Sequence, residues 1–235
     1  MEEGMLENAR YERKFILPNA HSVNCEAFVR SLPLLFQKTH ASRQVNNIYF
    51  DTRNLDCLND TIDGEAKRFK VRVRWYGSFF EKNKYQIEIK SKINLLGYKS
   101  VFDLGQNKVD SVNLFSRSLT DFCGNKLPTE LELKYLNFNT TLANSYYREY
   151  YLSACKSLRL TVDKKIKALP LRYRNSFPSL TPIKQDLTII EVKFEPSAFD
   201  DFRWLANQLP IRFSRFSKYE IGMHEDLTLK IKNIV

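Results

Sequence analysis

Glycine and proline are scarce in this chain of 235 residues, with 7 and 8 occurrences. Flexible linkers are rich in these residues, so their scarcity leaves little room for loosely tethered modules. No apolar run approaches the roughly 20 residues that a membrane-spanning helix requires. The acidic stretch at residues 1–15 also lacks the apolar segment of a signal peptide. We therefore expect a cytoplasmic protein that does not insert into a membrane.

Cysteine and histidine form no recognisable site in the sequence. The four cysteines include no CxxC pair, which argues against a zinc ribbon and favours free buried thiols in a reducing compartment. The three histidines, His21, His40 and His224, lie at no metal-ligand spacing. The chain also lacks a glycine-rich phosphate loop, a kinase signature and a Ser–His–Asp pattern. Any phosphate chemistry must therefore use side-chain cations.

Basic residues dominate the charge of the chain. Lysine and arginine number 37 against 27 aspartates and glutamates, which gives a net charge of +10. Such a charge predicts an anionic partner, and nucleic acid, an acidic membrane surface and polyphosphate all qualify. No repeat or composition shift divides the sequence, so we expect a single domain over residues 1–235 with its core at about 10–224.

The stretch RFKVRVRWYG at 68–77 alternates polar and apolar residues. Because successive side chains of a strand point to opposite faces, Arg68, Lys70, Arg72 and Arg74 would share one face. Neighbours in this row lie about 6–7 Å apart, and each pair repels by roughly 2–3 kcal/mol at an effective dielectric near 20. We expect an anion to offset this repulsion.

Charged faces recur on strand after strand of the predicted sheet. Alternation predicts strands at 11–17, 45–52, 68–76, 85–92, 145–153, 158–166 and 188–195. An ordinary sandwich turns its apolar faces inward and its charged faces to water. Here charges of both signs oppose strongly apolar faces, which favours an α+β fold: a closed antiparallel β-barrel with a polar, basic lumen and peripheral helices. Helices are expected at 22–33, 111–122 and 197–209.

The row of cations has less specific explanations. Such a strand is often a solvated face or a nucleic-acid platform, and nearby aromatic residues could stack on bases. However, Phe69 and Trp75 have the opposite parity to the cations, so we expect them in the wall of the fold. Tyr76 shares the cationic face.

Three glutamates are each followed two positions later by a lysine: Glu12, Glu88 and Glu191. They count against simple nucleic-acid binding. Cross-strand salt bridges would explain them. A divalent-metal site in a phosphate pocket would explain them too, since Mg²⁺ and Mn²⁺ use one or two carboxylates together with phosphate oxygens.

Eight ordered motifs resemble the VTC domain, the catalytic domain of the vacuolar transporter chaperone polyphosphate polymerases. They are RYERKF (10–15), NNIYFDT (46–52), RFKVRVRWYG (68–77), EIKSKINLLGYK (88–99), YYREYY (146–151), LRLTVDKKI (158–166), IIEVKFE (189–195) and FSKYEIG (216–222). This family belongs to the triphosphate tunnel metalloenzymes, or CYTH superfamily. The resemblance implies transfer of the γ-phosphate of ATP to a growing polyphosphate chain, with Mn²⁺ or Mg²⁺. We expect neither an SPX regulatory domain nor a transmembrane segment in this chain.

The resemblance also implies roles for individual residues. It makes the following residues catalytic phosphate ligands: Lys14, Arg72, Arg74, Lys90, Arg148, Arg159, Lys193 and Lys218. Further substrate-binding positions are Lys92, Lys99, Tyr146 and Ser217. Glu191 matches the metal-binding glutamate, and Glu12 and Glu88 are additional candidate ligands.

One position departs from the wider superfamily. The first strand there often reads ExExK, whereas this chain has Arg10, Glu12 and Lys14 at those positions. The missing carboxylate weakens the case for a two-metal hydrolytic site and favours a polymerase. An inorganic or nucleoside triphosphatase on the same fold remains an alternative, as does a non-catalytic polyphosphate- or RNA-binding module. We expect ATP and inorganic polyphosphate or triphosphate as partners, with no nucleic acid and with any membrane-protein partner unidentified.

Overall fold

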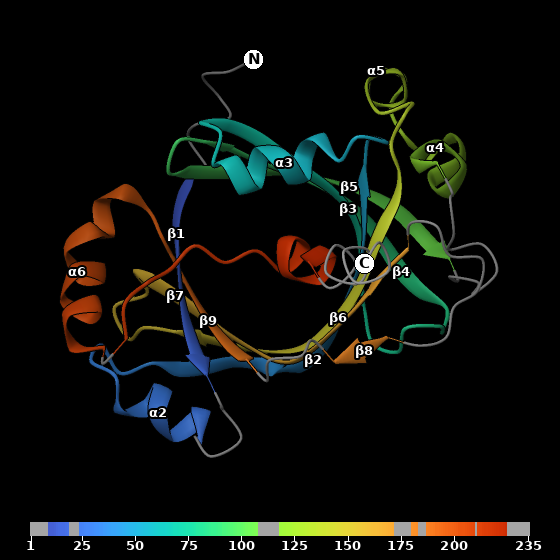
Figure 1. The fold of residues 1–235 in the computed structure, drawn as a ribbon. Coiled ribbons are helices and arrows are strands. Elements are labelled where there is room, and N and C mark those ends of the chain that lie inside the picture. Colours follow the sequence, from blue (N-terminus) through green and yellow to red (C-terminus); the bar gives the residue numbers. More distant parts are fainter. Residues whose placement is uncertain are drawn as a thin grey trace, which may run out of the picture.

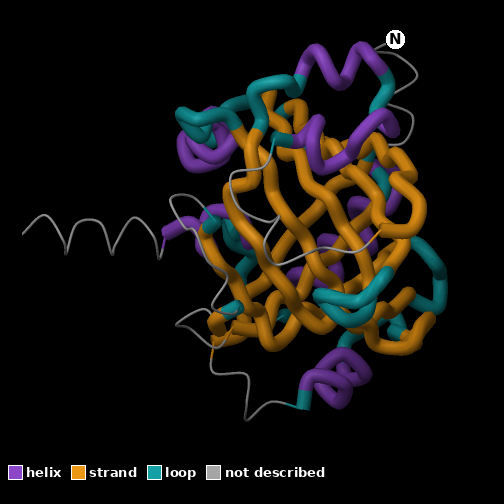
Figure 2. Tube along the Cα trace, turned by 90° about the vertical axis from the view of Figure 1, so that its right-hand side faces the viewer, coloured by secondary structure: helices purple, strands orange, loops and turns teal. Residues whose placement is uncertain are grey.

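A ring of eight antiparallel strands forms the centre of the computed structural model, which describes residues 9–18, 24–107, 118–171, 180–182, 187–209 and 211–224. The strand order is β6-β2-β3-β4-β5-β1-β9-β7, and a β6–β7 pairing closes the ring (Figure 1). The strands run obliquely around it, as Figure 2 shows. The predicted closed antiparallel sheet is therefore confirmed.

The strands of the ring have these bounds: β1 (Arg10–Pro18), β2 (Gln37–Asp51), β3 (Lys67–Tyr76), β4 (Asn83–Ile93), β5 (Leu96–Asn107), β6 (Asn139–Leu152), β7 (Leu158–Pro170) and β9 (Leu187–Phe194). A short β8 (Thr181–Pro182) pairs with β7. The helices are α2 (Cys25–Ser31), α3 (Asp56–Asp63), α4 (Leu119–Cys123), α5 (Thr129–Lys134) and α6 (Phe199–Gln208), with 3₁₀ turns η3 (Gly124–Lys126) and η4 (Pro196–Ala198). Residues 218–224 are also helical. None of the described helices is long and apolar enough to cross a bilayer.

All seven predicted strands are present, and β2, β6 and β7 extend farthest beyond the predicted ranges. The remaining strand of the ring, β5, was not predicted. The predicted helix at 22–33 is shorter, because Asn24 caps it by accepting a hydrogen bond from the backbone N–H of Ala27. Most of the predicted helix at 111–122 lies outside the described residues. The helix predicted at 197–209 is α6, and its Phe202 and Leu205 are buried as expected, whereas Phe199 is 46% exposed.

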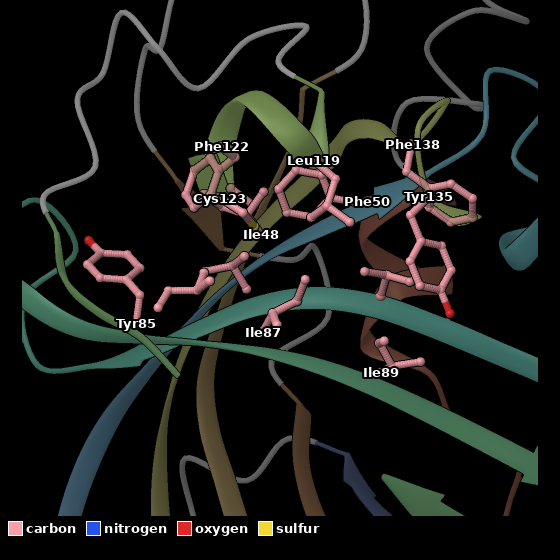
Figure 3. Packing of buried hydrophobic residues seen from close by; sticks show 14 of the residues in the cluster. Ile48, Phe50, Tyr85, Ile87, Ile89, Leu119, Phe122, Cys123, Tyr135 and Phe138 are labelled. Atoms are coloured by element: carbon pink, nitrogen blue, oxygen red, sulfur yellow. The ribbon is translucent and has the colours of Figure 1, made fainter. Parts of the chain in front are cut away.

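The apolar faces of the strands point outward and are covered by helices. One buried cluster lies between β2, β3 and β4 and the segment that carries α4 and α5 (Figure 3). Trp75 belongs to it, fully buried with its ring 4.8 Å from that of Tyr85, so its predicted place in the wall is confirmed. A second cluster packs α2 and α6 on β1, β7 and β9. Because both clusters lie on the outer face of the sheet, its inner face lines the lumen.

A third apolar cluster joins the ring to the helical segment 218–224, which lies inside the ring (Figure 1). Tyr219 anchors this segment: its ring stacks on Tyr49 at 4.8 Å and its hydroxyl donates to the carboxylate of Asp51 at 2.8 Å. Asp51 also accepts hydrogen bonds from the backbone of Cys57 and Leu58 at the start of α3. The sequence pattern did not indicate this arrangement, which fills part of the lumen.

Candidate active site in the lumen

A cavity of roughly 1900 Å³ occupies the lumen and is lined from all around the ring. The structure brings twelve of the predicted site residues to its wall: Lys14, Arg72, Arg74, Lys90, Lys92, Lys99, Tyr146, Arg148, Arg159, Lys193, Ser217 and Lys218. Glu12 and Glu191 line it too, whereas Glu88 is buried behind the lining at 2% exposure. Lysine and arginine greatly outnumber glutamate in the lining, so the cavity is strongly basic.

Glu88 on β4 is the counter-ion of the two arginines of β3. Its carboxylate accepts hydrogen bonds from Arg72 at 2.6 and 3.0 Å and lies 3.4 Å from Arg74. Lys99 approaches to 3.3 Å. Burial would raise the pKa of Glu88, but Arg72 and Arg74 outweigh it and hold the pKa far below its usual value. The salt-bridge explanation therefore applies to Glu88.

A second buried carboxylate, Asp163 on β7, neutralises two more cations. Arg148 binds it through two hydrogen bonds of 2.6 and 2.7 Å, and Lys218 donates a third at 2.5 Å. Burial opposes ionisation of Asp163, yet Arg148 and Lys218 lower its pKa. Asp163 was not among the predicted site residues, although it shares the parity of Arg159 and Thr161 on the same strand.

Glu12 and Glu191 lie among three lysines. Lys90 of β4 reaches past β5 to Glu12 at 2.7 Å, and Lys193 lies 2.6 Å from Glu191. Lys14 contacts both carboxylates, at 3.2 and 3.9 Å. Burial and the neighbouring glutamate would raise the pKa of Glu12, but the lysines lower it. Burial lowers the pKa of Lys90 to about 8, against the opposing effect of Glu12.

The donor set limits which metal could bind here. Within the described residues, no three His, Cys, Asp or Glu side chains gather closely enough to enclose a metal ion. Glu12 and Glu191 are electrostatic neighbours that face the cavity, and a pair of carboxylates suits Mg²⁺ or Mn²⁺ when phosphate oxygens and water supply the other ligands. The oxygens of Glu88 are already occupied by Arg72 and Arg74. Glu12 and Glu191 therefore fit a metal better than Glu88 does.

Lys70 also faces the cavity, although it was not among the predicted site residues. Its Nζ donates to the hydroxyl of Ser217 at 2.8 Å. Burial and the nearby Lys14 and Lys90 lower the pKa of Lys70 well below its ordinary value. The sequence could have indicated this position, because Lys70 lies two residues before Arg72 and so shares its face of β3. Lys70 is thus a further candidate phosphate ligand.

These contacts revise the expectation that an external anion alone offsets the repulsion among the cations. Buried carboxylates already neutralise part of the charge, because cross-strand neighbours such as Arg72 and Glu88, or Arg148 and Asp163, pair directly. Lys70 and Arg159 face the cavity without entering these pairs. A bound polyanion could therefore contact cations outside these pairs as well as arginines that the carboxylates already hold in position.

One known family model covers nearly the whole chain. Residues 9–225 match the model of the VTC domain. The chain belongs to the VTC domain family. The resemblance of the eight motifs is thereby confirmed. No curated protein matches the chain.

The solved structure of a plant protein shares the fold of this VTC domain at low sequence identity. HpAC1 from Hippeastrum, described as a putative adenylyl cyclase with a dominant triphosphatase activity, is 14% identical with a TM-score of 0.54, over 92% of this chain and 95% of that one. PH1819 from Pyrococcus horikoshii OT3 is 14% identical with a TM-score of 0.49, over 92% and 99% of the two chains. The ring is thus the triphosphate tunnel fold.

Proposed function

We propose that this VTC domain is a polyphosphate polymerase that transfers the γ-phosphate of ATP to the end of an inorganic polyphosphate chain and releases ADP. The main support is the convergence of cations from all eight strands of the ring and from segment 218–224 on one cavity. Condensed phosphates carry negative charge on every unit, so an extended basic lumen suits them better than it suits a single anion. The family supports the same substrate class.

The residues of the lumen suit phosphoryl transfer, which requires mainly positioning of the reactants and neutralisation of charge. Arg72, Arg74 and Arg148 offer planar guanidinium groups that can bind phosphate oxygens in pairs. In the proposed reaction a terminal oxygen of the acceptor chain attacks the γ-phosphorus. The bond to the β–γ bridging oxygen breaks, and its electron pair leaves with ADP. The attacking oxygen is already ionised at neutral pH, so the reaction needs no strong general base.

We expect Mn²⁺ or Mg²⁺ to bind at Glu12 and Glu191. When bound, such an ion would offset the charge that develops on the leaving group. Lys14 and Lys193 now contact these carboxylates and would become available to phosphate oxygens instead. Arg10, at the position where the superfamily often has a further carboxylate, cannot ligate a metal, which favours the polymerase over a two-metal hydrolase.

The second candidate function is hydrolysis of triphosphates, with water in place of the acceptor chain. The Hippeastrum protein, which shares the fold, is described with a dominant triphosphatase activity. Incubation of the pure protein with ATP and Mn²⁺ separates the two reactions. We expect a ladder of long phosphate chains on a gel together with ADP. Free phosphate without chains would identify a hydrolase.

A substitution of Glu191 separates catalysis from binding. We expect Glu191→Gln to abolish turnover and to retain ATP binding, because the lysines and arginines of the lumen remain. Glu195→Gln is the matched control, since Glu195 lies just after the same strand but is exposed. A non-catalytic binding module would instead show no turnover in the wild-type protein, with equal or higher affinity in Glu191→Gln.

A further inference from the structure

Along the inward face of β6, the residues that face the lumen change from apolar to polar and aromatic. Leu142 packs against Gly222 of the helical segment, and Tyr146 lies beside Lys218, whose Nζ is 4.7 Å from the centre of the tyrosine ring. Arg148 and Tyr150 follow on the same face and line the cavity. Tyr150 therefore lies towards the end of the lumen that segment 218–224 does not fill.

At this end three strands contribute a group of planar side chains, which we call the Arg43 cluster: His40, Arg43, Tyr76 and Tyr150. The guanidinium carbon of Arg43 lies 5.7 Å from the ring centres of both Tyr76 and Tyr150. The ring of His40 meets Tyr150 edge-on at 5.7 Å. All four residues line the cavity, and Tyr76 is 37% exposed. The cluster thus opens into the same space as the phosphate-binding candidates.

The register places Arg43 directly opposite Arg148 on the neighbouring strand. Like charges in opposite positions of a sheet are destabilising. Asp163 neutralises Arg148, whereas the guanidinium group of Arg43 lies over the rings of Tyr76 and Tyr150 and forms no ion pair with the described residues. An anionic ligand with a planar group would offset the charge of Arg43 and could stack on the planar side chains around it.

We propose that the Arg43 cluster binds the base of a nucleotide whose phosphates lie deeper in the lumen, at Arg148 and Arg74. This inference rests on the proposed function, because it takes the lumen as the phosphate site. Bases stack on aromatic rings and on guanidinium planes, while polyphosphate has no planar group to use them. Arg148 and Tyr150 are two positions apart on one strand, about 6–7 Å, which is comparable to the span of the ribose between base and phosphate.

The test compares two ligands that differ only in the nucleoside. Titration calorimetry in Mg²⁺ buffer would measure the affinities of ATP and of inorganic triphosphate for the wild-type protein and for Arg43→Lys, which keeps the charge but removes the plane. We expect ATP to bind roughly five- to tenfold more weakly to the variant, with triphosphate changed by less than about twofold. Tyr76→Ala should act in the same direction, and Arg203→Lys on the outer helix α6 is the control.

Equal losses for ATP and triphosphate, or no loss for ATP in either variant, would overturn the base site. Equal losses would mean that the guanidinium group of Arg43 contacts the phosphates, and no loss would mean that its planar group has no part in binding. A wild-type protein that binds neither ligand would instead contradict the proposed function, and the base site would fail with it. The triphosphate titration of the wild-type protein therefore tells the two failures apart.

Discussion

Asp163 and Glu88 are fixed counter-ions that keep arginines at defined positions in the lumen before any substrate arrives. Each is almost inaccessible to solvent and bound by at least two cations. Such pairs add little net stability compared with apolar residues, but removing one partner leaves the other charge buried. Their value here is that the guanidinium groups are already oriented for phosphate.

This arrangement predicts a large effect of Asp163→Asn on stability. Arg148 and Lys218 would remain buried without a charged partner, so the free energy of unfolding should fall by about 3 kcal/mol in urea titrations. Asp103→Asn is the control, since Asp103 pairs with Lys84 on the exposed surface and its substitution should cost far less stability. Excess triphosphate should restore part of the loss in Asp163→Asn. Similar losses in the two variants would contradict the proposed role of Asp163.

The lowered pKa values of Lys90 and Lys70 predict that phosphate binding is linked to proton uptake. The pKa of Lys90 is about 8, so Lys90 loses its proton at moderately alkaline pH in the free protein, and the pKa of Lys70 is also well below its ordinary value. A phosphate beside them favours the charged form and raises each pKa. Binding of triphosphate should therefore take up protons above about pH 8 and weaken as the pH rises further.

Calorimetry in buffers of different ionisation enthalpy measures this uptake. We expect Lys70→Met to reduce the number of protons taken up, because a phosphate beside Lys70 would raise its lowered pKa again. Lys84→Met, on the exposed surface, is the control. Proton uptake that is absent in the wild-type protein, or unchanged in Lys70→Met, would show that Lys70 does not meet the phosphate.

Individual lumen residues were predictable where parity alone decided them. Arg72 and Arg74 follow from the alternation of β3, and Lys70 could have been included on the same ground. The partner of each carboxylate could not be predicted, because it depends on the order of strands. Glu12 and Lys90 meet although β5 lies between their strands, and the sequence does not state that order.

At the scale of elements, segment 218–224 is held inside the ring by a small number of polar contacts. The hydroxyl of Tyr219 donates a hydrogen bond to Asp51 and lies 3.0 Å from the hydroxyl of Thr141. The same segment brings Lys218 to Asp163, and the residue before it, Ser217, to Lys70. Tyr219 is therefore a positioning residue for two predicted substrate contacts.

We expect Tyr219→Phe to lower the free energy of unfolding by about 1–2 kcal/mol, since the buried carboxylate of Asp51 loses a hydrogen bond. It should also weaken triphosphate binding, because Ser217 and Lys218 are less firmly held. Fluorescence-monitored unfolding and calorimetry would measure the two effects. Tyr147→Phe on the outer surface is the control. Lost stability with unchanged triphosphate affinity would mean that the segment has no part in binding.

Strands were more predictable than helices for a physical reason. Most strands of the ring alternate charged or polar inner residues with apolar outer residues, so the period of two is strong. Around segment 218–224 the inner residues are apolar instead, among them Leu142 and Ile189. The helices α3 and α5 span only 8 and 6 residues, too short for a clear apolar stripe. The place of segment 218–224 depends on the contact between Asp51 and Tyr219, 168 positions apart, which no local pattern reveals.

For the whole molecule, the essential feature is that the sheet closes on itself. Closure turns inner faces that would otherwise meet water into the wall of one basic cavity. The recurrence of charged faces predicted this closure. The extent of the lumen could not be predicted, because the β1–β5 contact involves only two residue pairs and segment 218–224 fills one part.

A crystal structure of the protein with inorganic triphosphate tests the shared phosphate lumen most directly. We expect density for the triphosphate inside the ring, in contact with side chains from different strands, including Lys14, Arg72 and Arg148. The same crystals should show Lys70 within hydrogen-bond distance of a phosphate oxygen. Triphosphate bound only on the outer surface, with the lumen holding none of it, would contradict this role.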